Sequence, residues 1–216
     1  MRRIHYRFAV VLGLILATLA FSLATPRGNL AHLMLVSLQA ATLVAAVVAS
    51  RAHRWVIRLS VVAALLGIAG AFIALIGTNE FDQGGALVVA LPYILFTPPA
   101  IVVGLVKHFR EEGGVTIQTM FGVLCLYLLI GLMFGFGFAL IDELSNGDFF
   151  AQGPAERDDF LYYSFTTLTT TGYGDLTAGT DLGRSLSITE ALIGQIYLVT
   201  VVALIVGNLR PARRRA

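Results

Sequence analysis

The chain consists mostly of long apolar runs separated by short polar segments. Six of these runs approach or reach the length of about 20 residues that a helix needs to cross a bilayer. They cover residues 8–24, 30–49, 59–77, 86–106, 119–141 and 185–208. The segment between the fifth and sixth runs is long enough to enter the membrane as a half-buried loop. The pattern therefore predicts an all-α integral membrane protein with six transmembrane helices.

The composition supports this class of protein. Hydrophobic residues make up 57% of the 216 positions and charged residues 13%, which is typical of a membrane protein. The chain has no His/Cys spacing for a metal site and no nucleophile beside a base, so the sequence does not predict an enzyme. Its single cysteine, Cys125, lies in the fifth run, where we expect it to serve packing. With only one cysteine in the sequence, an intrachain disulfide is excluded.

Positive charge gathers on one side of the predicted membrane. The lysines and arginines beside the apolar runs on that side are Arg2, Arg3, Arg7, Arg51, Arg54, Arg58, Lys107, Arg110, Arg210, Arg213, Arg214 and Arg215. Because such residues favour the cytoplasmic side, we expect both termini in the cytoplasm of a plasma (cell inner) membrane protein. The net charge of +2 lies in these clusters, so they predict contact with lipid headgroups rather than nucleic acid. The first run also resembles a signal peptide, and its cleavage would leave the other orientations unchanged.

One polar string, Thr-Thr-Thr-Gly-Tyr-Gly-Asp at residues 169–175, follows an aromatic-rich segment. Gly172 and Gly174 alternate there with bulkier residues, and glycine enters backbone angles that other residues avoid. A backbone that alternates in this way can point successive carbonyl oxygens to one side. Several copies around an axis would stack rings of carbonyl oxygens that replace the water shell of a potassium ion.

This string resembles the selectivity filter of the tetrameric pore-loop potassium channel superfamily. Thr171 stands where the pattern Thr-Val-Gly-Tyr-Gly has valine. The resemblance implies a homotetramer with K⁺ as the permeant ion. It also implies that the carbonyls of Thr170, Thr171, Gly172 and Tyr173 coordinate the ion, with the Thr170 hydroxyl at the cavity end. The side chain of Tyr173 is then expected to point away from the pore.

The residues before the filter predict the pore helix of that superfamily. Residues 160–169 are expected to form a short helix with Asp158 and Asp159 as N-terminal caps. The negative end of its dipole would face the ion cavity and favour a cation.

Other residues are expected to support the filter. Tyr162 and Tyr163 resemble the aromatic pair that braces it in related channels. The resemblance places the Tyr162 hydroxyl on Asp175, which follows Gly174 just outside the filter. Thr166 stands where some channels have a buried glutamate, so the sequence predicts altered slow inactivation.

The last two runs contain small and polar residues that the pore could use. Gly194 stands where many potassium channels carry an inner-helix hinge. Glu190 lies inside the same apolar run, and an intramembrane carboxyl is costly; we expect a structural brace, with a protonation gate as the alternative. Gly131 and Gly135 form a GxxxG pair in the fifth run that allows close helix approach, and we expect it to pack on the inner helix.

Acidic residues crowd the segment that precedes the pore helix. Residues 142–159 contain six of them, namely Asp142, Glu143, Asp148, Glu156, Asp158 and Asp159. Around a tetramer they would concentrate cations at the outer mouth, while some of them would cap the pore helix instead.

The chain divides into two predicted domains. Residues 1–115 are expected to form a four-helix, voltage-sensor-like domain, and residues 116–216 the pore domain. The topology resembles that of voltage-gated channels, but the fourth run has no arginine or lysine before Lys107. Arg51, Arg54 and Arg58 lie at the end of a run and are interpreted as anchors. Strong voltage sensing is therefore not expected.

The sequence as a whole predicts a potassium-selective channel with passive conduction and no evident soluble ligand. Two alternatives stay open, a non-selective cation channel and a non-conducting regulatory membrane subunit. A carrier is less consistent with the sequence, because carriers show paired repeats with broken helices and this chain has a single pore loop.

Overall fold

The computed structural model describes residues 7–24, 29–50, 54–76, 97–107, 110, 115–145 and 149–208. The regular elements in these ranges are helical, and a β-bridge pairs Phe150 with Ala178. The helices are α1 (Arg7–Ala24), α2 (Asn29–Ala49), α3 (Arg54–Ile76), α5 (Ile117–Leu144), α6 (Arg157–Leu168), α7 (Asp181–Ile196) and α8 (Ala203–Gly207), with a π-helical segment at Tyr197–Val202. The predicted all-α fold is confirmed.

Polar N-terminal caps extend α5 and α7 beyond the apolar runs predicted for them. The Thr116 side chain accepts a hydrogen bond from the Thr119 amide at 3.3 Å and starts α5 two residues before the predicted run. The Thr180 side chain accepts one from the Gly183 amide at 3.1 Å and starts α7 four residues early. A side-chain oxygen that pairs a free amide of the first turn stabilises a helix start, so these threonines define where both helices begin.

Two helical stretches in the described ranges are long and apolar enough to cross a membrane. They are Ile117–Leu144 and Asp181–Val202, and shorter apolar helices occupy Phe8–Ser22, Leu33–Ala49 and Thr97–Lys107. Only the second half of the predicted fourth run lies in the described part of the chain. The six-span topology therefore stays a prediction.

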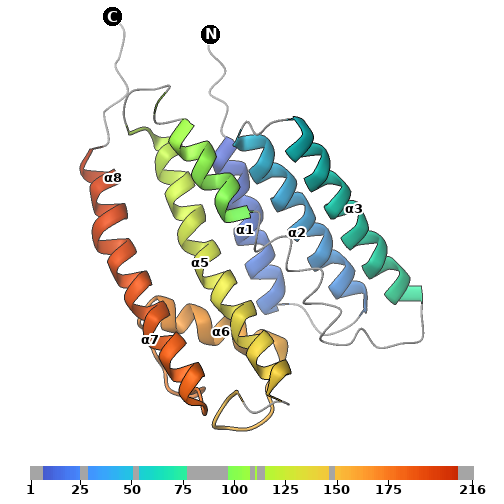
Figure 1. Ribbon diagram of the computed structural model, residues 1–216, viewed down its shortest axis with the longest axis vertical. Coiled ribbons are helices and arrows are strands. Elements are labelled where there is room, and N and C mark those ends of the chain that lie inside the picture. The colour runs from blue at the N-terminus through green and yellow to red at the C-terminus, as the bar shows by residue number, and fades with distance from the viewer. Residues whose placement is uncertain are drawn as a thin grey trace, which may run out of the picture.

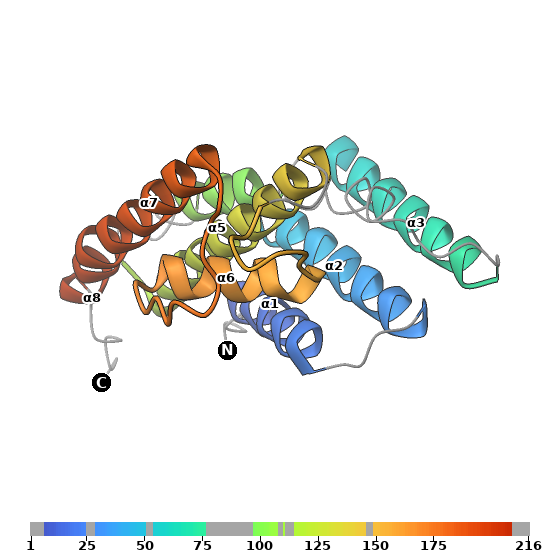
Figure 2. The same ribbon diagram turned by 90° about the horizontal axis from the view of Figure 1, so that it is seen from below.

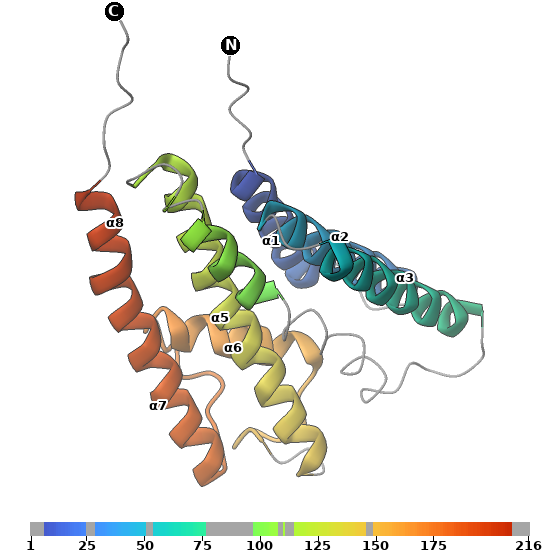
Figure 3. The same ribbon diagram turned by 45° about the horizontal axis from the view of Figure 1, so that its top comes forward.

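The helices lie side by side with α5 in the middle. Figure 1 shows α7 and α8 on one side of α5, and α1, α2 and α3 in succession on the other. Figure 2 shows the short α6 running crosswise to α5 and α7, and Figure 3 shows α1, α2 and α3 as one group beside α5. The chain is thus arranged as a lateral three-helix group next to the α5–α8 unit.

One end of this arrangement carries basic residues. The start of α1, the start of α3 and the end of α8 share that end, while α6 and the start of α7 lie at the opposite end (Figure 1). Arg54 and Arg58 are exposed on the first turns of α3, whereas Arg51 lies outside the described residues. The exposure of the two arginines fits the predicted anchors.

The first helix packs directly on α5. The amide of Phe8 donates to the Gln118 side chain at 3.2 Å, and the Cys125 thiol donates to the Phe8 carbonyl at 3.7 Å. Cys125 is fully buried in an apolar cluster between α1, α2 and α5. This confirms that the cysteine serves packing.

Gly131 and Gly135 face a different helix from the one we expected. A Cβ added at Gly131 would meet the Phe165 ring at 2.8 Å, and one at Gly135 would meet the Leu161 side chain at 2.8 Å. Both neighbours belong to α6. The expected packing on the inner helix is therefore wrong, because these glycines make room for the crosswise α6 instead.

Candidate functional site

The helix that leads into the Thr169–Asp175 string starts earlier than predicted. Its N-cap is Glu156, whose amide donates to the Asp159 carboxylate at 2.9 Å. Asp158 and Asp159 lie within the first turn, where carboxylates favour the positive end of the helix dipole. The expected start at residue 160 with these two residues as caps is corrected, and α6 ends at Leu168.

The backbone after α6 folds back over the end of the helix. The amides of Thr171 and Gly172 both donate to the Thr166 carbonyl, at 2.8 and 3.2 Å, and the Thr170 amide donates to the Thr167 carbonyl at 2.9 Å. These bonds occupy backbone amides of the string. Its carbonyl oxygens accept no such bond from the described backbone.

Three alternate residues in this string have left-handed backbone angles. They are Thr170 at φ 56°, Gly172 at φ 53° and Gly174 at φ 81°. The intervening Thr171 and Tyr173 do not. The alternation expected from the two glycines is present, and it extends to a threonine.

The left-handed angle of Thr170 could not be foreseen from its residue type. A β-branched residue with positive φ is a backbone outlier, and such residues gather at functional sites. The angle is held by the Thr170 amide bond to Thr167 and by a 2.9 Å contact between the Thr169 and Thr171 hydroxyls. The surrounding contacts therefore hold this strained backbone in place.

The string is exposed in the single chain. Residues 169–175 are all exposed, and Tyr173 is 71% exposed. The stretch from α7 through the π-helical segment to α8 also exposes large apolar side chains. They are Leu182, Ile188, Leu192, Ile193, Ile196, Leu198, Val199 and Val206. Exposed apolar surface of this extent marks contact with a membrane or another protein.

Tyr162 on α6 braces the outer part of the string. Its hydroxyl donates to the Asp175 carboxylate at 2.8 Å, and its ring stacks on that of Tyr173 with 6.3 Å between centroids. The hydrogen bond to Asp175 raises the pKa of the Tyr162 hydroxyl, so the hydroxyl stays a donor. The structure thus contains the predicted pair of Tyr162 and Asp175.

We expect Tyr162→Phe to weaken this brace. The substitution removes the hydroxyl bond to Asp175 and leaves only the ring contact with Tyr173 to hold the string on this side. Any ion flux through the string should then decline faster during sustained activity. Asp175→Asn, which keeps an acceptor oxygen, is the matched control, and a Tyr162→Phe protein with unchanged decline would contradict the brace.

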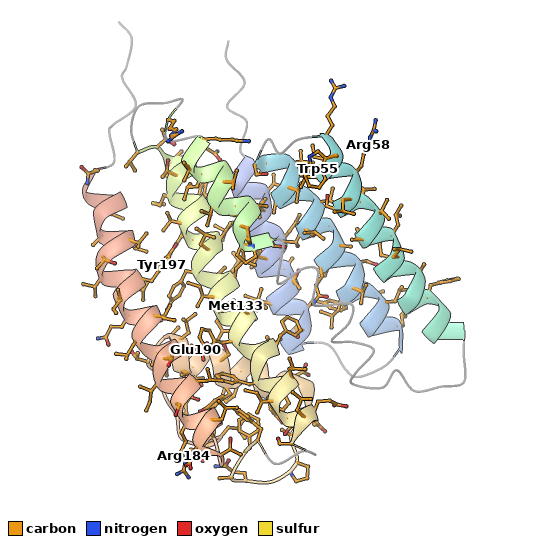
Figure 4. The ribbon with its side chains drawn as sticks, viewed as in Figure 1. Trp55, Arg58, Met133, Arg184, Glu190 and Tyr197 are labelled. Carbon is orange, nitrogen blue, oxygen red and sulfur yellow. The ribbon has the colours of Figure 1, made fainter. Side chains whose placement is uncertain are left out.

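A polar strip joins α6 to α7. Ser187 and Glu190 lie three residues apart on α7 and share a face. The hydroxyls of Tyr163 and Ser187 are 2.8 Å apart, and the Ser164 hydroxyl is 2.5 Å from the Glu190 carboxyl. Figure 4 shows Glu190 where α7 crosses α6. Glu190 therefore links α7 to α6 through Ser164; the choice between a structural brace and a protonation gate stays a prediction.

Gly194, four residues further along this face, packs directly on the end of α6. A Cβ added there would collide with the Leu168 carbonyl oxygen and side chain. The same Leu168 carbonyl accepts a 3.3 Å hydrogen bond from the Tyr127 hydroxyl of α5. Gly194 thus has a packing role at the base of the string; the hinge role stays a prediction.

A segment of π-helix begins three residues after Gly194. It spans Tyr197–Val202, and the Tyr197 hydroxyl donates to the Val123 carbonyl of α5 at 2.7 Å. π-Helical turns often occur at functional sites. The sequence carries no signal for this segment, which has neither proline nor glycine.

A comparison with protein families identifies this part of the chain. Residues 126–210 match a family model described as "Ion channel". The match supports a place for this region in the pore-loop ion-channel superfamily. The match begins within α5 and includes α6, the string, α7 and α8, which form an ion-channel domain of the kind that conducts ions passively. Neither the curated proteins nor the solved structures gave a match.

Asp142 of the channel domain does not belong to the predicted acidic mouth. It is only 4% exposed, and its carboxylate accepts a 3.1 Å hydrogen bond from the Phe149 amide. Phe149 lies in an aromatic cluster with Phe138, Phe150 and Phe160. Asp142 is therefore a structural support of this cluster, while Asp148 lies outside the described residues.

The segment after the Thr169–Asp175 string is tied to the loop before α6. The Ala151 amide donates to the Thr177 carbonyl at 2.9 Å, and the Gly179 amide donates to the Phe149 carbonyl at 2.8 Å. The Gln152 side chain adds two 3.0 Å bonds to Thr177. Sequence reasoning missed Gln152, because one glutamine in a polar loop carries no distinguishing signal.

Proposed function

We propose that the chain forms a homotetrameric, potassium-selective channel that conducts K⁺ passively across a membrane. The observation that carries the proposal is the alternation of left-handed residues at Thr170, Gly172 and Gly174 within Thr-Thr-Gly-Tyr-Gly. The carbonyls of Thr170, Thr171, Gly172 and Tyr173 replace the water shell of K⁺, and the Thr170 hydroxyl serves the cavity end.

Selectivity in this account comes from a rigid ring of oxygens. Backbone amides of the filter donate hydrogen bonds to carbonyls of α6, and these bonds anchor the filter backbone to that helix. Tyr162 holds Asp175 beside the filter at 2.8 Å. The C-terminal end of α6 adds its negative dipole below the filter. K⁺ is the permeant ion rather than a resident cofactor.

The exposure of the filter string supports the proposed tetramer. One chain supplies one strand, and residues 169–175 are exposed in the single chain. A closed ring of four strands places them around an axis, which supplies the missing surroundings. The exposed apolar residues of α7 then face neighbouring chains or lipid.

The remaining topology follows from the charge pattern. Six spans divide into residues 1–115 and 116–216, both termini are cytoplasmic, and the filter faces outward in a plasma membrane. Arg54 and Arg58 are exposed at the start of α3. Their place at a helix start supports an anchoring role, so the channel responds weakly to voltage.

Reconstitution in liposomes tests the function. The purified chain should carry K⁺ in preference to Na⁺, with little change when the membrane potential is stepped. Native mass spectrometry of the same sample should give four chains per particle. Equal K⁺ and Na⁺ flux would favour the non-selective cation channel, and absence of flux from a verified tetramer would favour the non-conducting regulatory subunit.

A further inference from the structure

Ser164 of α6 has two acceptors within reach of one hydroxyl. Its oxygen lies 2.6 Å from the Gly131 carbonyl oxygen of α5 and 2.5 Å from Oε1 of Glu190 on α7. Ser164 and Glu190 are both 0% exposed. Three helices therefore meet at a single buried hydroxyl.

The number of hydrogens at the Ser164 hydroxyl bears on the protonation state of the Glu190 carboxyl. A serine hydroxyl donates one hydrogen bond, and a backbone carbonyl donates none. With an ionised carboxylate, only one of the two short contacts would hold a hydrogen. With a protonated Glu190, the carboxyl donates to Ser164 and Ser164 donates to Gly131, so both short contacts become hydrogen bonds.

The second carboxyl oxygen gives independent support. Oε2 of Glu190 is buried and has no hydrogen-bond partner among the described residues. An unpaired oxygen of an ionised carboxylate in an apolar site is far less favourable than an unpaired neutral carbonyl oxygen. No cation in the described part of the chain acts on Glu190.

The titratable groups that face the site do not supply the missing hydrogen. The Tyr127 hydroxyl of α5 donates to the Leu168 carbonyl at 3.3 Å. The Tyr163 hydroxyl of α6 pairs with the Ser187 hydroxyl of α7 at 2.8 Å. Both phenols are thus engaged elsewhere.

We propose that Glu190 is protonated at neutral pH and acts as a positioning residue, donating a hydrogen bond that runs through Ser164 to Gly131. This chain of bonds holds α6 between α5 and α7. Since α6 ends at Leu168, directly before the filter string, its position sets the position of the filter. The predicted brace is therefore one that depends on a proton, and its effect on conduction rests on the proposed channel function.

The dependence on pH has a definite direction. A proton held in the folded protein is present at neutral pH and is lost as the pH rises. Ionised Glu190 would stop donating to Ser164, and the bond to α5 or to α7 would be lost. Alkaline conditions should therefore loosen α6 and lower the flux, whereas mild acid should leave both unchanged.

Infrared difference spectroscopy tests the protonation directly. The full chain at neutral pH should show the carbonyl stretch of a protonated carboxyl, absent in Glu190→Gln and shifted to higher frequency in Ser164→Ala. Glu143→Gln, which changes an exposed glutamate near the end of α5, is the matched control and should keep the band. Absence of the band from the wild-type tetramer at neutral pH would overturn the proposal.

Flux measurements test the positioning role separately. Glu190→Gln supplies an amide donor to Ser164, so it should keep its flux and lose the alkaline decline; Glu190→Ala should lose flux. An equal alkaline decline in wild type and Glu190→Gln would overturn the role. A wild type with the carboxyl band but no ion flux under any condition would refute the channel function while leaving the protonated Glu190 intact, so the two failures are distinguishable.

Discussion

Replacing Gly172 by alanine should abolish potassium-selective flux. The residue has φ 53°, and no neighbouring atom lies within 4 Å of an added Cβ. The effect therefore comes from the backbone alone, because a left-handed angle costs a non-glycine residue about 1–2 kcal/mol. In the proposed tetramer four chains share one filter, so this conformational cost would act four times on the same ring of carbonyls. The measurement is K⁺ flux into liposomes.

The matched control for this prediction is Gly137→Ala. Gly137 lies in α5, also without an atom within 4 Å of the added Cβ, and alanine favours a helix over glycine by roughly 0.5–1 kcal/mol. We expect this variant to assemble and conduct as the wild type does. Undiminished K⁺ selectivity in Gly172→Ala would show that the left-handed angle does not serve conduction.

Replacing Gly194 by alanine should destabilise the tetramer. The added Cβ would meet the backbone carbonyl of Leu168, which cannot move without shifting the end of α6. Overpacking of a tight contact costs about 1–3 kcal/mol per chain, and in the proposed tetramer this cost arises in each of the four chains. We expect a lower melting temperature in detergent and loss of the tetramer band at moderate heat.

Gly207→Ala is the matched control for Gly194. Gly207 lies on α8 at the end of the same helical stretch, with open space around an added Cβ, so its variant should melt as the wild type does. A hinge role alone predicts a different outcome for Gly194→Ala, with unchanged melting and altered gating. That outcome would contradict the packing role derived from the contact with Leu168.

The sequence predicted the features that depend on residue type and local pattern. Gly172 and Gly174 predicted the alternating backbone, because only glycine takes left-handed angles freely. Runs of apolar residues predicted the helices of the described ranges to within a few residues. The pair of Tyr162 and Asp175 came from a resemblance, and the structure contains it at 2.8 Å.

The features that the sequence did not predict depend on three-dimensional neighbours. A GxxxG pair indicates that another helix approaches closely, but it does not indicate which helix. The sequence therefore predicts that Gly131 and Gly135 pack on the inner helix, although they face α6. The sequence does not indicate which aspartate of an acidic segment is buried. It therefore predicts Asp142 at the outer mouth, although its carboxylate accepts a hydrogen bond from the Phe149 amide. The left-handed angle of Thr170 is imposed by its neighbours against its own preference.

The reversal potential of the purified channel in a planar bilayer tests the central claim most directly. With K⁺ on one side and Na⁺ on the other, current through the alternating filter of residues 170–174 should reverse close to the potential at which K⁺ alone is in equilibrium. The same experiment with Gly172→Ala should give no K⁺-selective current, and Gly137→Ala should match the wild type. A wild-type reversal potential near zero, with K⁺ and Na⁺ carrying equal current, would contradict the account.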